Sequence, residues 1–192
     1  MKKFILALTA LIISSGCAFA QKYRGFFDLS YSYSLPKSGE TDLEAYQRSY
    51  YGLSTSHGVQ IKKFFVGVGL EGLTNLSDGV DIPVFADVRY DFFGRKTTNF
   101  FVGCKLGAYV YSNGLYFDYP GYNDGKATGL YFKPSIGVRF RLSPVVGINL
   151  ALFYSPMNVK FPEAVWTSDG YLEYSHKTVF INRLGLSIGL DF

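Results

Sequence analysis

The feature that most constrains this chain is a strict alternation of apolar and polar residues. The C-terminal segment shows it clearly, because Leu184, Leu186, Ile188, Leu190 and Phe192 alternate with arginine, glycine, serine and aspartate. Side chains two residues apart in a β-strand point to the same face, so the segment predicts a strand with one apolar and one polar face. After residue 20 there is no continuous apolar run of about 18 residues, so no transmembrane helix is expected there.

The same pattern recurs seven more times, at residues 22–35, 50–58, 64–71, 84–92, 100–110, 130–141 and 146–155. The segments between these strands alternate in length. Long polar segments follow the odd strands, at 36–49, 74–81, 113–128 and 156–175, and tight turns follow the even strands, at 59–63, 94–98 and 142–144. Long loops at one end and short turns at the other are typical of outer-membrane barrels. We therefore predict an all-β fold, a transmembrane antiparallel up-and-down β-barrel of about eight strands, with a soluble β fold as the alternative.

The N-terminus predicts export. A basic start at residues 1–3 precedes an apolar stretch at 4–13 and the cleavage-site pattern Ala18-Phe19-Ala20. These features indicate a signal peptide at residues 1–20 and a mature barrel at residues 21–192. A lipoprotein is the alternative, because Gly16-Cys17 resembles the end of a lipobox, although Ser14 stands where leucine is usual.

Charge and cysteine content limit the partners and the covalent structure. Cleavage would lower the formal net charge from +4 to +2, since it removes two lysines and no acidic residue. A nearly neutral mature protein gives no reason to expect a nucleic-acid partner. Cleavage would also leave Cys104 as the single cysteine, so no internal disulfide is expected.

The polar faces of the predicted strands carry many charges, which a barrel would turn toward its lumen. An eight-stranded barrel is filled by side chains, and an unpaired ion inside it would be costly. We interpret the set as a structural ion-pair network, with a narrow ion path as the alternative. Its members are Arg24, Asp28, Glu71, Asp87, Arg89, Lys105, Lys133 and Arg183, with Arg139 and Asp191 on the same faces. Pro134 lacks the N–H that a strand ladder needs, and therefore predicts a bulge.

No enzyme site is recognisable. A lipid-hydrolysing barrel would need a serine, a histidine and usually an acid near its outer rim, and His176 with Glu173 is the only candidate. Ser175 adjoins His176, but adjacent residues of a strand point to opposite faces. One cysteine and two distant histidines, His57 and His176, cannot build a metal site. We expect no enzymatic activity and no cofactor.

One predicted loop is rich in aromatic residues and therefore is a candidate contact surface. Tyr116, Phe117, Tyr119 and Tyr122 lie close together in sequence, and Trp166 lies in the loop predicted before the last strand. Exposed aromatic side chains often mark binding surfaces, so these residues predict contact with an extracellular ligand or protein. The alternative is a loop that packs its own aromatic side chains onto the barrel rim.

Several segments resemble a known family. SHGVQ at 56–60 leads into FFVGVG at 64–69, and IPVFADVR at 82–89 and PSIGVRF at 134–140 follow. In these segments the chain resembles the outer-membrane β-barrel domain family of Bacteroidetes, which is related in style to PorT-like and OmpX/OmpA-like small barrels. Phe192 is similar to the terminal aromatic residue that the barrel-insertion machinery recognises. The resemblance implies an outer-membrane location in a Gram-negative bacterium and carries over no catalytic residue.

These inferences lead to one functional expectation. We expect a non-enzymatic barrel that acts in envelope structure or in partner or ligand binding. Its expected partners are outer-membrane lipid, the insertion machinery during biogenesis and an unidentified extracellular ligand. A narrow channel and a lipid-modifying enzyme are the alternatives.

Overall fold

A computed structural model describes residues 22–35, 49–75, 79–94, 97–112, 126–166 and 172–192, with the backbone alone over 161–177 and at 179. The signal peptide expected at residues 1–20 lies outside these residues. Within them, no helix has the length and apolar character needed to cross a membrane.

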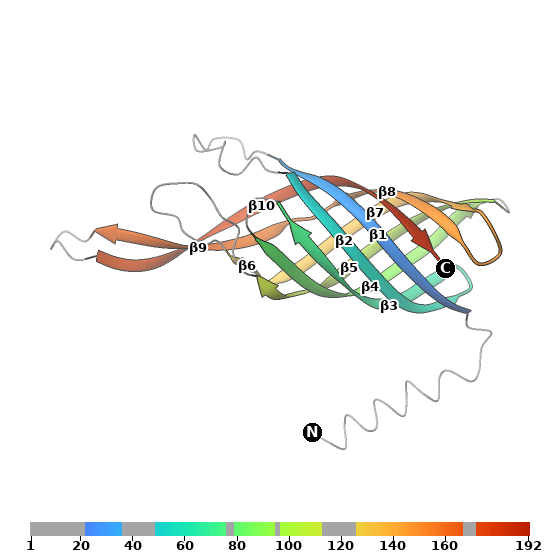
Figure 1. Cartoon of the computed structure of the whole chain (residues 1–192), viewed down its shortest axis with the longest axis horizontal. Helices are drawn as coiled ribbons and strands as arrows, with labels where there is room; N and C mark the ends of the chain where they lie inside the picture. The colour runs from blue at the N-terminus through green and yellow to red at the C-terminus, as the bar shows by residue number, and fades with distance from the viewer. Residues whose placement is uncertain (1–21, 36–48, 76–78, 95–96, 113–125, 167–171) are drawn as a thin grey trace, which may run out of the picture.

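Most of the described residues lie in strands, which short turns connect at 62–63 and 142–146 (Figure 1). Strict alternation favours this conformation because it gives each extended segment two chemically distinct faces. The strands are β1 (Lys22–Leu35), β2 (Ser49–Ile61), β3 (Phe64–Thr74), β4 (Val80–Gly94), β5 (Thr98–Ser112), β6 (Lys126–Thr128), β7 (Leu130–Arg141), β8 (Gly147–Tyr154), β9 (Met157–Trp166) and β10 (Leu172–Asp191).

Eight of these strands close into an antiparallel ring. Their order is β1-β2-β3-β4-β5-β7-β8-β10, and β10 pairs back to β1. The closing register places Leu29 opposite Ile188, and Phe192 continues the seam by exchanging two backbone hydrogen bonds with Gly25. Closure gives every strand of the ring two neighbours and leaves no open edge. The predicted barrel of about eight antiparallel strands is confirmed.

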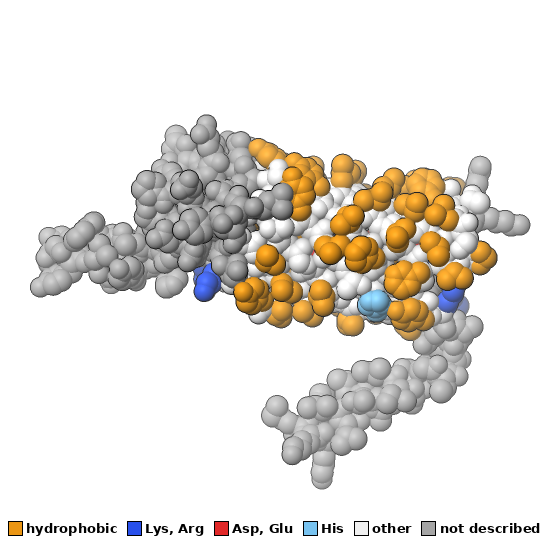
Figure 2. Space-filling view, viewed as in Figure 1, with side chains coloured by type: hydrophobic (Ala, Val, Ile, Leu, Met, Phe, Trp, Pro, Cys, Tyr) orange, Lys and Arg blue, Asp and Glu red, His pale blue; other side chains and the backbone are white. Residues whose placement is uncertain are grey.

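The two faces of the ring differ sharply in chemistry. Apolar side chains point outward from every strand of the ring; Val68 and Leu186 are 68% and 60% exposed. Charged side chains point inward, and Glu71 is fully buried at 0% exposure. Figure 2 shows the apolar side chains spread along the visible wall of the barrel. The outer wall is therefore the apolar surface and the lumen is the polar interior.

The segment 156–175, predicted as a loop, instead contains strand structure. β9 pairs with the first half of β10 from Met157↔Ile181 to Trp166↔Leu172, and β6 adds to β9 at Lys126↔Lys160. This hairpin continues β10 past the ring at the long-loop end (Figure 1). The loop prediction was wrong because the alternation continues here: Met157 and Val159 are buried, whereas Asn158 and Lys160 are not.

The bulge predicted at Pro134 is also wrong. The β5–β7 register runs unbroken through Cys104↔Pro134, and the described pairing of β7 with β8 begins one residue later, at Ser135. At Pro134, β7 is paired with β5 but not yet with β8. A missing N–H on the side of β8 therefore disrupts no ladder. The register shifts lie instead between β4 and β5, where Val110 of β5 is the extra residue at Ile82 and Pro83, and Phe92 of β4 is the extra residue between Asp91 and Phe93.

Candidate functional site

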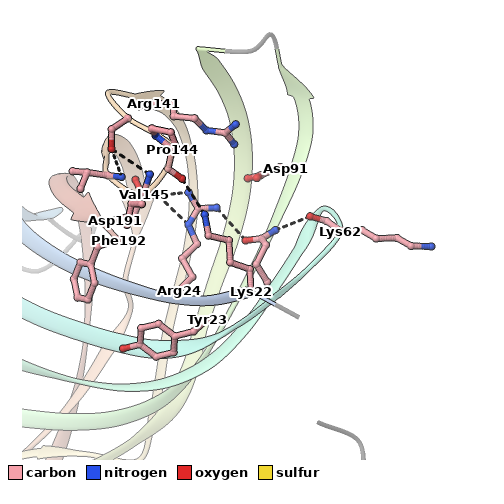
Figure 3. A pocket seen from close by; sticks show the side chains of 13 residues that line it. Lys22, Tyr23, Arg24, Lys62, Asp91, Arg141, Pro144, Val145, Asp191 and Phe192 are labelled. Atoms are coloured by element: carbon pink, nitrogen blue, oxygen red, sulfur yellow. Dashed lines mark hydrogen bonds and ion pairs between the residues drawn. The ribbon is translucent and has the colours of Figure 1, made fainter. Parts of the chain in front are cut away.

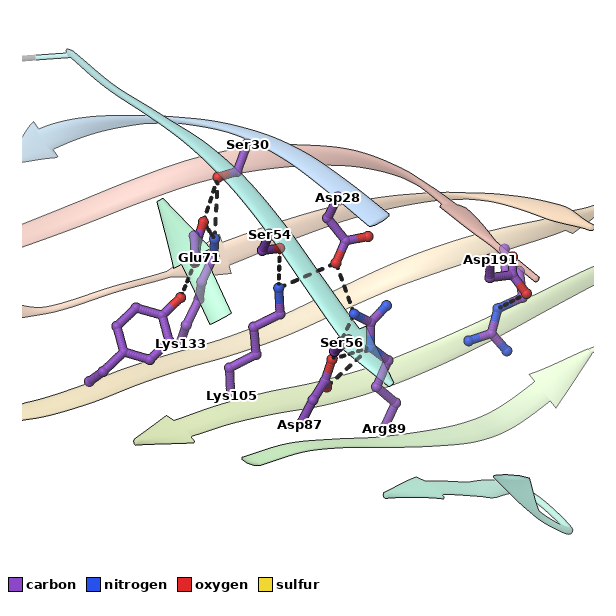
Figure 4. A network of polar contacts seen from close by, with 12 residues as sticks. Asp28, Ser30, Ser54, Ser56, Glu71, Asp87, Arg89, Lys105, Lys133 and Asp191 are labelled. Atoms are coloured by element: carbon purple, nitrogen blue, oxygen red, sulfur yellow. Dashed lines mark hydrogen bonds and ion pairs between the residues drawn. The ribbon is translucent and has the colours of Figure 1, made fainter. Parts of the chain in front are cut away.

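The middle of the lumen holds a charge cluster that joins opposite walls (Figure 4). Arg89 on β4 donates to Asp87 on its own strand at 2.8 Å and to Asp28 on β1 at 2.9 Å. Lys105 on β5 contacts the same Asp28 carboxylate at 3.3 Å and donates to Ser54 on β2 at 2.7 Å. Because β1 and β5 lie opposite each other in the ring, the Lys105–Asp28 contact spans the lumen.

A second cluster lies nearer the long-loop end. Lys133 on β7 donates to Glu71 on β3 at 2.7 Å and to Ser30 on β1 at 3.3 Å. Ser30 donates to Glu71 at 2.9 Å, and Tyr131 donates to the other Glu71 oxygen. The buried carboxylate of Glu71 is thus held by one cation and two hydroxyl groups, of which Lys133 and Tyr131 come from β7 and Ser30 from β1.

A third cluster lies at the short-turn end. Arg24 on β1 forms an ion pair with Asp191 on β10, and its guanidinium also donates to Gln60 at 3.2 Å. Arg139 on β7 donates to both oxygens of Asp91, at 3.0 and 2.8 Å. Each carboxylate of this end therefore already has a guanidinium partner.

Arg183 is the exception among the predicted lumen charges. It is buried on β10, and no ion pair among the described residues includes it. Its guanidinium donates to the backbone oxygen and hydroxyl of Ser155, at 3.2 and 3.0 Å, and lies 4.9 Å from the ring centroid of Tyr50. Hydrogen bonds and an aromatic face, rather than a carboxylate, therefore stabilise this cation.

Aromatic side chains fill the space between the clusters. The rings of Phe26 and Phe65 meet edge to face at 4.8 Å between centroids, and Arg89 lies 3.7 Å from the Phe26 centroid. A cavity of about 20 Å³ remains beside Asp28, Lys105 and neighbouring side chains. A space of this size holds about one water molecule. Cross-lumen bonds and packed rings therefore occlude the middle of the barrel.

The structure places all eight predicted network residues, Arg24, Asp28, Glu71, Asp87, Arg89, Lys105, Lys133 and Arg183, on the lumen side, and joins all except Arg183 in ion pairs. Sequence reasoning did not identify the aromatic filling. Phe26 was the available signal, because it lies between two inward residues, Arg24 and Asp28, and shares their face. Similarly, the hydroxyls of Ser54 and Tyr131 were not assigned a role in the network.

The side chains predicted to contact an extracellular partner are not described by the structure. Tyr116, Phe117, Tyr119 and Tyr122 fall outside the described residues. Trp166 ends β9 opposite Leu172, at the far end of the hairpin, and its side chain is not described.

The two histidines lie far apart on the chain's strands. His176 stands in β10 opposite Pro162, and its side chain is likewise outside the description. His57 lies on the outer wall, where Nδ1 bonds Tyr23 at 2.6 Å and Nε2 bonds Thr55 at 2.9 Å. Its neighbour Ser56 points into the lumen and donates to Asp87 at 2.8 Å. Adjacent serine and histidine therefore do not form a nucleophile and base pair at this position.

A closed eight-stranded antiparallel ring with an apolar wall and a charged, filled lumen is the architecture of small outer-membrane β-barrels. The crystal structure of Neisserial surface protein A, NspA, is similar, with a TM-score of 0.61 and 14% sequence identity over 90% of this chain and 98% of that chain. The solid-state NMR structure of the outer membrane protein AlkL in lipid bilayers is also similar, with a TM-score of 0.53 and 10% identity over 88% of each chain. No protein-family model matches the chain, and no curated protein matches it in sequence. At these identities the similarity establishes the fold.

Proposed function

We propose that this chain is a non-enzymatic outer-membrane barrel whose lumen is closed and whose long-loop end contacts an extracellular partner or ligand. The observation that carries the proposal is the division between the apolar outer wall and the occluded, charged lumen. A water-soluble protein rarely exposes a continuous apolar surface of this extent. In lipid the same wall is favourable, and ring closure satisfies the backbone groups that hydrocarbon cannot.

The filled lumen favours a structural or binding role over transport. An ion would have to displace the Lys105–Asp28 and Lys133–Glu71 contacts, which join opposite or distant strands. Breaking buried pairs of this kind costs about 3–5 kcal/mol each. The route is further blocked by the stacked contact of Arg89 with Phe26.

Planar-bilayer recording tests the closed lumen. We expect the refolded mature protein, residues 21–192, to give no stepwise conductance. A double variant that truncates the central filling, Phe26→Ala with Arg89→Ala, is the matched positive control and is expected to conduct if it folds. Discrete openings of the unmodified protein would instead support the narrow-channel alternative.

Cell fractionation with surface proteolysis tests location and orientation. We expect the chain in the outer-membrane fraction, with cleavage from outside only in the long loops and no cleavage in the turn at Lys62–Lys63. The N-terminus of the mature protein should begin at Gln21, which tests the signal peptide. Recovery in the soluble fraction would contradict the membrane assignment.

The remaining assignments belong to the same proposal. Membership of the Bacteroidetes barrel family is supported by the segments at 56–60, 64–69, 82–89 and 134–140, which lie in β2, β3, β4 and β7 of the ring. Phe192 at the seam is the proposed signal for the insertion machinery. The absence of catalysis is tested by His176→Ala, which should leave the lipid A profile of cells unchanged.

A further inference from the structure

The two ends of the barrel differ in the charge that they carry outside the lumen. In sequence, the start of β1 and the three short turns contain six basic residues and no acidic one: Lys22, Lys62, Lys63, Arg95, Lys96 and Arg141. The long connections at the other end carry an acidic excess, with Glu40, Asp42, Glu44, Asp78, Asp118, Asp124, Glu163, Asp169 and Glu173 against Lys37, Arg48, Lys126, Lys160 and Lys177. The barrel is therefore polarised, with its positive end at the short turns.

A cavity of about 300 Å³ opens at this positive end (Figure 3). It lies along the rim where the start of β1, the ends of β2 and β10 and the β7–β8 turn meet, an arc that crosses the barrel seam. Lys22 holds the turn in place by donating to the backbone oxygen of Pro144 at 2.9 Å. The volume is at the lower end of the range of small-ligand sites.

The cavity carries an excess of positive charge. Its two side-chain carboxylates, Asp91 and Asp191, are already paired with Arg139 and Arg24. Three further cations line it, Lys22, Lys62 and Arg141. The Lys62 side chain extends away from the other lining residues, and its backbone oxygen accepts from Gln60 at 3.0 Å (Figure 3). No ion pair among the described residues includes any of these three. The cavity therefore favours an anionic ligand.

One side of the same cavity is apolar and continuous with the outer wall. Tyr23 and Phe192, which are 57% and 42% exposed, point outward from the seam and line it. Val145 and Val146 of the β7–β8 turn add to this side. The ligand therefore has an anionic group for the cations and an apolar part that reaches the outer wall. A free anion would leave the apolar side without a partner.

We propose that this cavity binds the phosphate-bearing headgroup of an anionic phospholipid in the periplasmic leaflet. The inference rests on the proposed membrane location, because only then do Tyr23 and Phe192 face acyl chains. In the orientation typical of outer-membrane barrels the short turns face the periplasm, where the leaflet consists of phospholipid. The cations contact the phosphate and the aromatic rings contact the glycerol and the upper acyl chain.

Lipid retention by the folded barrel tests the site. The mature protein is folded into vesicles that contain equal amounts of phosphatidylglycerol and phosphatidylcholine, and folding is verified by heat-modifiable gel mobility. It is then extracted in mild detergent, and bound lipid is counted by native mass spectrometry. The test variant is Lys62→Gln with Arg141→Gln. The matched control is Lys126→Gln with Lys160→Gln. It removes two exposed cations at the long-loop end, which stand at opposite positions in the register of β6 and β9.

The unmodified barrel and the control should retain phosphatidylglycerol in preference to phosphatidylcholine. The preference should fall by roughly fivefold for each basic residue removed, thus by about 25-fold in the test variant. Arg141→Gln alone, expected to show about a fivefold fall, serves if the double variant does not fold.

Three results would overturn the inference. These are equal retention of the two lipids by the unmodified barrel, an equal fall in test and control variants, and displacement of the lipid by inorganic phosphate, which would identify a free anion as the ligand. A chain that never folds in vesicles would instead overturn the proposed membrane function on which the inference rests.

Discussion

Replacing Glu71 with glutamine removes one charge from the lumen and almost no volume. Glu71 accepts from Lys133, Ser30 and Tyr131, and Lys133 is itself buried against the ring of Phe153, with its Nζ 4.0 Å from the centroid. The amide oxygen can still accept from Ser30, but Lys133 then has no carboxylate partner in an interior from which bulk water is excluded. The change therefore isolates a buried cation without creating a cavity.

The expected loss follows from the asymmetry between breaking a buried ion pair and replacing it. Removing one partner of a buried pair costs about 3–5 kcal/mol of unfolding free energy, because the other charge stays desolvated. Lys133→Met should cost a similar amount by isolating Glu71. The double variant removes both charges and places an apolar chain against Phe153, so we expect it to be at least about 2 kcal/mol more stable than the sum of the single losses predicts.

Urea titration of the barrel in lipid vesicles measures these differences, with the folded fraction read from heat-modifiable gel mobility. Ser34→Ala on the same lumen face is the control; Ser34 Oγ has no described hydrogen-bond partner, and its loss should cost less than about 1 kcal/mol. The reasoning is refuted if the two single losses add to within about 0.5 kcal/mol in the double variant, because independent sites behave in that way.

Three further predictions concern the strand ladder and the outer wall. Gly58→Ala should destabilise the barrel by about 1–3 kcal/mol in the same titration, because the added Cβ would lie 2.2 Å from the backbone oxygen of Val66. The control, Gly72→Ala, should be neutral because its Cβ would meet nothing within 4 Å. Equal losses in the two variants would contradict the predicted clash at Gly58. Leu186→Lys on the outer wall should lower the unfolding free energy in vesicles by about 2–4 kcal/mol. The control, Ser187→Ala on the lumen side, should lower it by less than about 1 kcal/mol. A lysine that is tolerated at position 186 would show that lipid does not contact this face. Cys104 lies on the outward side of β5, between Val102 and Leu106. A charged maleimide should therefore label Cys104 only after unfolding, whereas an apolar maleimide should label the folded barrel in vesicles. Rapid labelling of the folded barrel by the charged maleimide would refute the lipid-facing assignment.

Local pattern was sufficient to predict most of the ring. The expected first strand, residues 22–35, matches β1, and the inward placement of Asp28 and Arg89 follows from counting alternate residues. Period-two alternation is a property of the extended backbone itself, so each strand reports its own two faces without reference to its neighbours. The hairpin of β9 and β10 was missed because a long polar connection was expected there, even though Met157 and Val159 continued the pattern.

The sequence by itself therefore determined that this chain forms strands with one apolar and one charged face, and which residues belong to each face. Only the tertiary structure decided which charges meet. Lys105 reaches Asp28 across the lumen, and Arg183 is stabilised by Ser155 and Tyr50 without a carboxylate. The physical reason is that strand faces depend on local backbone geometry, whereas partners across a lumen depend on the closure, tilt and register of the whole ring.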